Sequence, residues 1–262
     1  MTVEVSDRVL EVRDVVAELL EDAGISEPPV DLKAVAAVRG VRRIRYAPLK
    51  SAYGLLKTGP TGHTITINKR HMSRARFTLA HEIAHTLVER FEYLDDEVPL
   101  AHLKPRRAGG VEAMCDEIAA EILFPFRMFE RALEDDATGI DEIQRLATLF
   151  DGSVMATANR FGNVTAQPVQ IISWVRHGSH ALRASQRSGR GFLTCRGTSP
   201  YRPLDRMTSA PVRAFHSGSR EHGMEVPLPD KPWNVYDCEA QRFSGGKGGY
   251  VLSVVRPANL AR

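Results

Sequence analysis

The most informative part of this 262-residue chain is residues 77–87, which read Phe-Thr-Leu-Ala-His-Glu-Ile-Ala-His-Thr-Leu. Apolar positions recur at helical spacing over residues 73–89, with Ser73 placed as N-cap, so this segment is predicted to be a helix. Histidines four residues apart share one helical face, and His81 and His85 can therefore reach the same tetrahedral Zn²⁺. Glu82 is then placed to take a proton from an attacking water.

A third ligand is expected on the next predicted helix, residues 111–123. A catalytic zinc site needs three protein ligands and an open fourth position. Glu112 and Asp116 lie one turn apart on this helix. As in gluzincin peptidases, Glu112 would supply the third ligand, and Asp116 would hydrogen-bond a ligand histidine and fix its ring. The alternative is that Glu112 is only a first-turn acid favoured by the helix dipole.

Cys115 shares a helical face with Glu112 and is a candidate inhibitory or switch thiol, because a thiolate is a strong zinc ligand. The preferred alternative is that Cys115 is a small buried residue. An oxyanion stabiliser is also required, and the sequence does not choose among four candidates. These are Tyr53, His71, Tyr93 and His102.

The segments around this motif predict an α+β fold. Helices are expected over residues 6–23 and 31–39, and strands over 41–46, 52–56 and 64–67 with a turn at 59–62. Further helices are expected over 126–133, 140–150 and 153–161, and further strands over 169–175, 191–195 and 250–255. One of the short strands 52–56 and 64–67 is expected to offer its edge to an extended peptide.

Residues 140–161 resemble a helix-turn-helix because Asp151-Gly152 separates two short helices. The preferred alternative is that these helices only pack on the preceding domain, since the second carries only Arg160 for contacts with DNA. The basic, glycine- and serine-rich segment 178–191 is expected to be an exposed loop.

Three domains are expected. Residues 1–125 are predicted to form a mainly helical domain with a small three-stranded sheet. Residues 126–165 form the helix-turn-helix-like segment, and residues 166–262 form a β-rich, basic domain.

Composition narrows the class of protein. Hydrophobic residues make up 43% and charged residues 26% of the chain, which excludes wholesale disorder. No apolar run approaches the roughly 18 residues of a membrane span, and the acidic, amphipathic N-terminus does not resemble a signal peptide. Cys115, Cys195 and Cys238 show no paired spacing. These features predict a cytoplasmic protein without a membrane partner.

Positive charge and aromatic rings gather in residues 166–262. This part has fourteen Lys/Arg against six Asp/Glu, a net charge of +8, whereas residues 1–165 have a net charge of −5. The combination suggests a site for a single-stranded nucleic acid or a small-molecule signal. The alternative is that the rings form the core and the arginines are solvated. The rings are Trp174, Phe192, Tyr201, Phe215, Trp233, Tyr236, Phe243 and Tyr250.

Three blocks of sequence resemble the ImmA/IrrE family of zinc metallopeptidases. They are Ile65-Thr-Ile-Asn68, Arg76-Phe-Thr-Leu-Ala-His-Glu-Ile-Ala-His85, and Glu112-x-x-Cys115-Asp116-x-Ile118-Ala-Ala-Glu-Ile-Leu-Phe-Pro125. The likeness covers about residues 6–125 and implies a zincin-like peptidase domain there. The remainder loosely resembles the longer IrrE-like members, which implies a sensor domain over residues 166–262 for which a GAF-like fold is considered. Cys115 stands where the family usually has alanine.

The resemblance implies a zinc endopeptidase that cuts a helix-turn-helix transcriptional repressor and so derepresses phage, mobile-element, defence or DNA-damage genes. It implies that His81, His85 and Glu112 bind zinc and that Glu82 is the general base. One rival is a non-proteolytic, zinc-containing regulator that binds a repressor or DNA, and another is a housekeeping peptidase. Glu82 argues against the regulator, because a structural zinc site needs no base beside its ligands.

Overall fold

The computed structural model describes residues 7–88, 91, 110–134, 138–177, 181–189, 203–204, 209–225, 236–244 and 249–258. The chain divides into two compact units, residues 1–128 and 129–262. Within the described residues, no helix is both long enough and apolar enough to cross a membrane.

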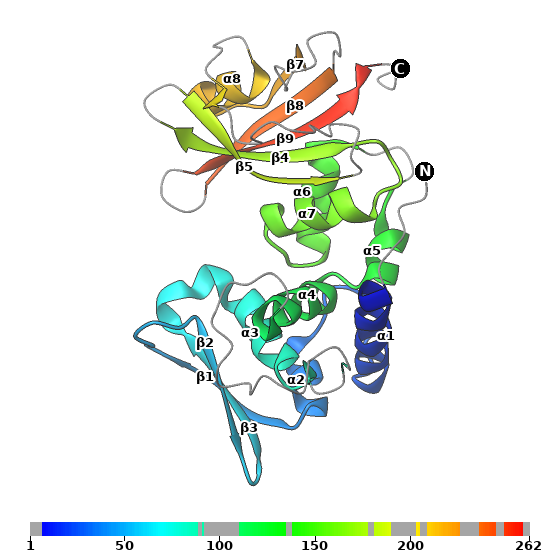
Figure 1. The fold of residues 1–262 in the computed structure, drawn as a ribbon, viewed down its shortest axis with the longest axis vertical. Helices are drawn as coiled ribbons and strands as arrows, with labels where there is room; N and C mark the ends of the chain where they lie inside the picture. The colour runs from blue at the N-terminus through cyan, green and yellow to red at the C-terminus, as the bar shows by residue number, and fades with distance from the viewer. Residues whose placement is uncertain are drawn as a thin grey trace. The chain divides into compact units, whose positions relative to one another are not determined.

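The helices of the first unit pack around a shared core (Figure 1). They are α1 (Asp7–Asp22), α2 (Leu32–Val38), α3 (Ala75–Ala84) and α4 (Val111–Leu123), with the 3₁₀ helix η1 (Lys69–Arg74) before α3. The short helix α5 (Phe126–Ala132) crosses the boundary between the two units. Val12, Val16 and Leu19 recur at helical spacing on α1 and are buried on the side that contacts α4. Asp31 caps α2 by accepting hydrogen bonds from the backbone N–H groups of residues 33 and 34.

A three-stranded sheet lies beside α3. Its strands β1 (Val41–Ala47), β2 (Gly54–Gly59) and β3 (Gly62–Asn68) have the order β1-β3-β2, so β2 is an edge strand. β3 runs parallel to β1 and antiparallel to β2. Ile65 and Ile67 of β3 are buried, and both β2 and β3 contact α3. The predicted mixed α+β character with a small three-stranded sheet is confirmed.

The helix of the His-Glu-x-x-His motif is shorter than predicted. α3 ends at Ala84 rather than near residue 89, although His85 keeps helical backbone angles. The N–H groups of Thr86 and Leu87 bond to carbonyls three residues back, and the Thr86 hydroxyl bonds to the carbonyl of Ile83. These contacts tighten the last turn and end the helix just beyond the second histidine.

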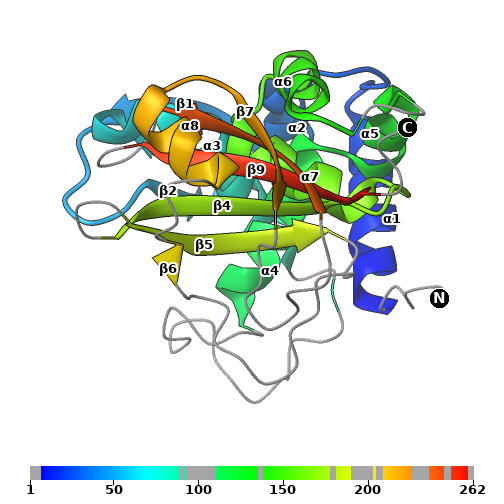
Figure 2. The same cartoon turned by 90° about the horizontal axis from the view of Figure 1, so that it is seen from above.

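The second unit has one antiparallel sheet with helices on both faces. The sheet order is β6-β5-β4-β9-β8-β7 among the described strands. Helix α8 lies on one face, and α6 and α7 lie on the other (Figures 1 and 2). The bounds are α6 (Ile140–Leu149), α7 (Val154–Val164), β4 (Gln170–His177), β5 (Ala181–Gly189), β6 (Pro203–Leu204), α8 (Ala210–Ser217), β7 (Glu221–Glu225), β8 (Tyr236–Phe243) and β9 (Tyr250–Pro257).

The expectation of an exposed loop was wrong for residues 181–189. Residues 181–189, expected within an exposed loop, form strand β5, which pairs with β4 from Ala181 to Gly189. Leu182 and Ala184 alternate with polar residues and are buried, so pairing outweighs the low strand propensity of glycine and serine. The expected strand 191–195 lies outside the described residues.

The second helix of the predicted helix-turn-helix-like segment 140–161 packs on a sheet. α7 contacts β4 and β5, and Thr157, Ala158 and Phe161 are buried. Along α7 only Asn163 is exposed, and the other residues are buried or partly exposed. A recognition helix needs a free face for the major groove, so this packing favours the alternative in which the helices pack. It packs against the sheet that follows it in the chain.

Candidate metal centre

Helices α3 and α4 bring together the three residues that the sequence proposes as metal ligands. His81 and His85 lie on one face of α3, with ring centroids 5.0 Å apart. Glu112, in the first turn of α4, lies against both rings. Its Oε2 is 3.2 Å from His81 Nε2, and its Oε1 is 3.7 Å from His85 Nε2. All the ligand atoms of this group lie within 4.8 Å of one another.

This donor set fits zinc. Two imidazole nitrogens and one carboxylate oxygen are typical zinc ligands, and a tetrahedral ion at about 2.1 Å holds its ligand atoms roughly 3.4 Å apart. The 3.2 and 3.7 Å separations on either side of Glu112 bracket that spacing. Among the described residues, no fourth His, Cys, Asp or Glu joins the group. Three ligands are the number expected of a catalytic site rather than a structural one.

Asp116 holds the ring of His81. Its Oδ1 lies 2.9 Å from His81 Nδ1, so a proton on Nδ1 is donated to the carboxylate and Nε2 is left facing Glu112. Burial lowers the pKa of His81, but the hydrogen bond and charge of Asp116, together with Glu112 and Glu82, outweigh burial and raise it overall. The structure thus places Asp116 where its expected role requires.

Cys115 contacts His85 on the nitrogen that faces away from Glu112. Its Sγ lies 3.4 Å from His85 Nδ1, and the residue is fully buried. Burial, reinforced by the charges of Glu112 and Asp116, raises the pKa of the Cys115 thiol, which keeps it protonated. Burial and the neighbouring His81 lower the pKa of His85. This geometry favours a packing role for Cys115 over direct contact with a metal.

Glu82 is a buried carboxyl group at the edge of the first sheet. Only 7% of the residue is exposed, and its side chain accepts a hydrogen bond from the backbone of Leu56 on β2. Burial raises the pKa of Glu82 to about 7, with the charge of Glu112 acting in the same direction and that of His81 opposing it. A base with this affinity for protons can both accept and return a proton near neutral pH.

Gly54 fits against Glu82 because it has no side chain. A Cβ at this position would overlap Glu82 Oε1 and lie 2.6 Å from Thr78 Cγ2. Sequence reasoning missed the contributions of Gly54 and Leu56 to the site. The signal that could have found Gly54 is a glycine inside a strand pattern, which often marks a close approach of another group.

Gly54→Ala is therefore expected to displace the Glu82 carboxyl group and slow peptide cleavage roughly 10- to 100-fold, while zinc content stays unchanged. Gly59→Ala is the matched control, because a Cβ at Gly59 in the same strand meets nothing closer than 3.6 Å. Cleavage rate and zinc content of the two proteins test this. A normal rate in Gly54→Ala would show that the position of Glu82 tolerates the shift.

Two of the four candidate oxyanion stabilisers can be placed. The rings of Tyr53 and His71 meet edge to face, with centroids 4.9 Å apart, and Arg74 lies over the Tyr53 ring. Tyr53 directly precedes Gly54, yet neither ring contacts the histidine pair in the described part of the chain. Tyr93 and His102 lie outside the described residues.

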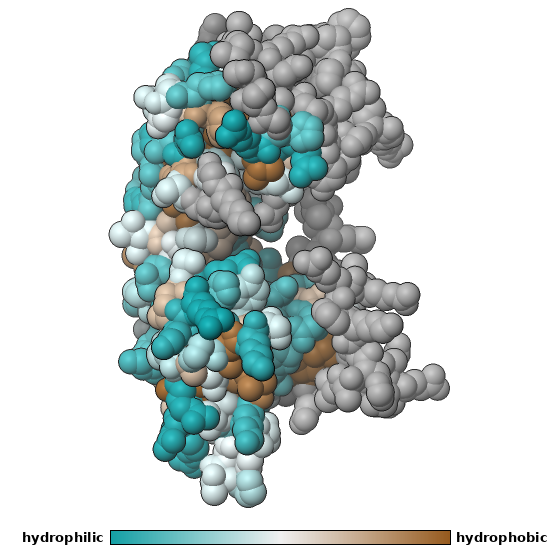
Figure 3. All heavy atoms as spheres, turned by 90° about the vertical axis from the view of Figure 1, so that its left-hand side faces the viewer, coloured by the Kyte–Doolittle hydropathy of each residue, from teal (hydrophilic) through white to brown (hydrophobic). Residues whose placement is uncertain are grey.

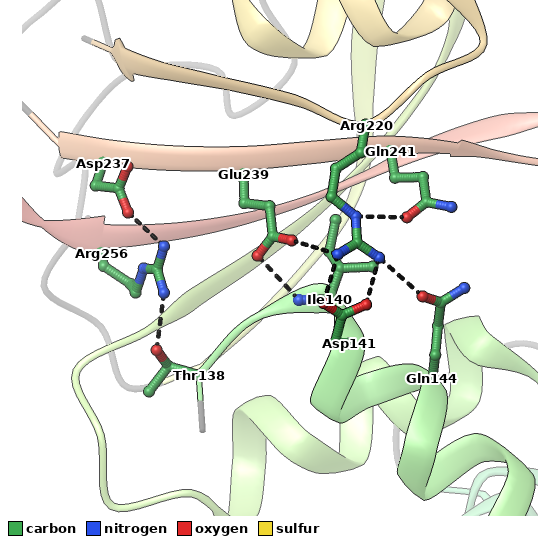
Figure 4. Close-up of polar contacts among 9 residues, drawn as sticks. All are labelled: Thr138, Ile140, Asp141, Gln144, Arg220, Asp237, Glu239, Gln241 and Arg256. Atoms are coloured by element: carbon green, nitrogen blue, oxygen red, sulfur yellow. Dashed lines mark hydrogen bonds and ion pairs between the residues drawn. The ribbon is translucent and has the colours of Figure 1, made fainter. Parts of the chain in front are cut away.

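The second unit uses several of its cations within its own fold. Arg220 binds Asp141 through two nitrogens at 2.6 Å and also lies 3.3 Å from Glu239 (Figure 4). The buried Glu239 carboxylate accepts a hydrogen bond from the N–H of Ile140 at the start of α6. These contacts join α6 to β8.

Other cations and rings in residues 166–262 have similar structural roles. Arg213 pairs with Glu221, and Arg256 pairs with Asp237. Trp174 is buried and donates to Ser253, and Tyr236 is buried in the same core. Phe192, Tyr201 and Trp233 lie outside the described residues. Trp174 and Tyr236 therefore follow the alternative interpretation, in which rings form the core, whereas Phe215, Phe243 and Tyr250 are only partly buried.

Comparison with known proteins finds a family match that covers most of the first unit and the start of the second. Residues 39–161 match the IrrE N-terminal-like domain family. No curated protein matches the sequence. Among solved structures, a Mycobacterium tuberculosis transcriptional regulator matches with a TM-score of 0.61 and 15% identity, over 98% of this chain and 82% of that one. At this identity the likeness concerns the fold alone.

Proposed function

From the match of residues 39–161 to the IrrE N-terminal-like domain family, which indicates a regulatory zincin-like peptidase, we propose that this chain is a zinc-dependent endopeptidase that cleaves a helix-turn-helix transcriptional repressor. One observation carries the proposal: His81, His85 and Glu112 converge while Glu82 lies buried beside them. Cleavage would derepress the genes that the repressor controls, with defence, mobile-element and DNA-damage genes as the expected classes.

In this proposal, separate residues bind the metal, transfer the proton and orient a ligand. His81, His85 and Glu112 would hold the zinc ion, which when bound acidifies water and polarises the scissile carbonyl. Glu82 accepts the proton of the attacking water and returns it to the leaving amine. Asp116 keeps the His81 ring in the tautomer that leaves Nε2 free for binding.

The edge strand β2 is suited to align the substrate. In the sheet order β1-β3-β2, one edge of β2 pairs with β3 and the other edge pairs with no described strand. The backbone of Leu56 on this strand hydrogen-bonds to Glu82. An extended peptide that adds to this edge would run past the base. A substrate must then offer an accessible, extendable loop, which supports selective cleavage over general digestion.

The specificity part of the proposal can be tested by digestion. The test substrate is the helix-turn-helix repressor whose gene lies nearest to the gene of this protein, and it is expected to give two discrete fragments. Casein is expected to stay intact under the same conditions. Degradation of casein at a comparable rate would favour the housekeeping peptidase.

Replacing Asp116 by Asn is expected to weaken zinc binding about 10- to 100-fold, because the amide cannot hold the His81 ring by the same charged hydrogen bond. Glu117→Gln is the control, since Glu117 is an exposed acid on the same helix that pairs with Arg8. Competition with a zinc indicator dye measures both affinities. Unchanged affinity in Asp116→Asn would remove the orienting role.

For residues 166–262 the sensor role remains part of the proposal. An antiparallel sheet with helices on both faces supports the GAF-like assignment. The expected boundary at residue 125 lies close to the division after residue 128, whereas the expected boundary at residue 165 falls within the second unit, where α6 and α7 contact the sheet. A small molecule is favoured over single-stranded nucleic acid as the signal, because Arg213, Arg220 and Arg256 are already paired with acids.

A further inference from the structure

The densest positive charge of this protein lies in the first unit. Residues 32–81 contain eleven Lys or Arg and no Asp or Glu. The net charge of −5 for residues 1–165 conceals this segment, because the acids lie before and after it. The segment comprises α2, all three strands of the first sheet, η1 and the start of α3.

Strand register places three of these cations on one face of the sheet. Arg43 and Lys57 flank Thr64 in one cross-strand row, and Arg45 pairs with Thr66 in the next row along. Paired residues lie on the same face, and strands are about 4.8 Å apart with rows about 7 Å apart. We call this face, formed by Arg43, Arg45, Leu55, Lys57, Thr64 and Thr66, the outer face.

The outer face is open to solvent. Arg43, Arg45, Leu55 and Lys57 are exposed, and the two threonines are partly exposed. The opposite face, with Ile65 and Ile67, is the one buried beside α3. Seen from the side of this sheet, the first unit shows many hydrophilic side chains with apolar ones between them (Figure 3).

Within the described part of the chain, no acid pairs with these three cations. Arg43, Arg45 and Lys57 form no ion pair with any described residue, in contrast to Arg213, Arg220 and Arg256 of the second unit. Further exposed cations, Lys69 and Arg70, follow on η1 at the end of β3. Such a surface carries several unpaired charges at close spacing, and it complements a polyanion.

We propose that the outer face binds the phosphate backbone of duplex DNA without reading its sequence. A duplex presents one phosphate per about 1.7 Å of axis, so several phosphates can meet cations spaced at strand and row distances. The threonine hydroxyls are suited to hydrogen-bond phosphate oxygens between the cations.

A single strand fits this face less well. Single-strand grooves use aromatic rings on which bases stack, and the outer face has none. Tyr46 pairs with Ile67 and so lies on the opposite face of the sheet. The Tyr53 ring already contacts Arg74 and His71. A peptide fits less well too, because a sheet face offers side chains only, whereas a peptide strand pairs with the backbone at an edge.

The test is fluorescence anisotropy of a labelled 20-base-pair duplex titrated with the full chain at several salt concentrations. The triple variant Arg43→Gln, Arg45→Gln, Lys57→Gln is expected to bind at least about tenfold more weakly. Its slope of log K against log[salt] is expected to be less negative than that of the parent by about 2 to 3. The matched control removes three exposed positive charges elsewhere, by Arg127→Gln, Arg131→Gln and Arg183→Gln. The control is expected to change binding less than about threefold.

Several outcomes would overturn the proposal. They are no duplex binding by the parent at low salt, equal losses in the triple variant and the control, or tighter binding of a single strand of the same length. Displacement of the duplex by poly-glutamate at equal charge concentration would assign the face to an acidic protein instead. Thermal melting confirms that each variant is folded. The Glu82→Gln protein should bind the duplex as the parent does, so this test is independent of peptidase activity.

Discussion

The Glu82→Gln protein is expected to keep one zinc ion per chain and its fold, yet to cleave the repressor at least about a hundredfold more slowly than the parent. Glutamine has the shape of glutamate and still offers an oxygen to the backbone of Leu56, but it cannot accept a proton from water. Zinc content, melting temperature and the rate of repressor cleavage are measured on the same preparation.

A second buried glutamate provides the control for this substitution. Glu121 on α4 is 6% exposed, and its carboxylate accepts a hydrogen bond from the N–H of Phe126 at 2.6 Å. Glu121→Gln neutralises a buried acid without touching the histidines and should leave cleavage largely intact. Appreciable cleavage by Glu82→Gln would favour the rival in which this chain is a non-proteolytic regulator.

Glu112→Ala is expected to lose zinc on dialysis against a chelator that leaves the parent loaded. The substitution removes the only carboxylate that lies against both His81 and His85 among the described residues. Loss of a ligand should weaken binding more than the roughly 10- to 100-fold expected at Asp116, which only orients a ligand. Elemental analysis after dialysis measures the effect.

Glu117→Ala is the control for Glu112→Ala, because it removes an exposed acid from the same helix and faces Arg8 instead of the histidines. Full zinc retention by Glu112→Ala would mean that a different acid completes the site. Loss of zinc in both proteins would point to a general effect of weakening α4.

The parts of the site that the sequence predicted are those set by local geometry. Two histidines four residues apart share a face in any helix, and the same holds for Glu112 and Asp116. Only one tertiary relation, the packing of α4 against α3, was then needed to bring the four side chains together. The resemblance to a known family supplied that relation.

The contacts of Glu82 with β2 depend on how a strand approaches a helix, and no periodicity encodes that approach. Gly54 and Leu56 became part of the site only through the placement of β2 beside α3. The early end of α3 has a similar origin, since the Thr86 hydroxyl and the shortened turn override a pattern that continues to residue 89.

In the second unit, pairing with a neighbouring strand determined the secondary structure of a segment that composition did not predict. Residues 181–189 are rich in polar and small side chains, and they form a strand because β4 supplies a full-length partner. The net charge of residues 1–165 also hid the location of the basic surface, because it summed the basic residues 32–81 with acidic helices before and after them. Strand register, which the sequence leaves open, is what gathers Arg43, Arg45 and Lys57 on one face.

The most direct test of repressor cleavage is mass spectrometry of the repressor after incubation with the zinc-loaded parent in ¹⁸O-labelled water. Two fragments are expected, with masses that sum to the intact repressor plus one water and with the label in the new carboxyl terminus. The Glu82→Gln protein should leave the repressor intact over the same period. An intact repressor after incubation with fully loaded parent would contradict repressor cleavage by this protein, and equal fragmentation by Glu82→Gln would contradict the role of Glu82 as the base.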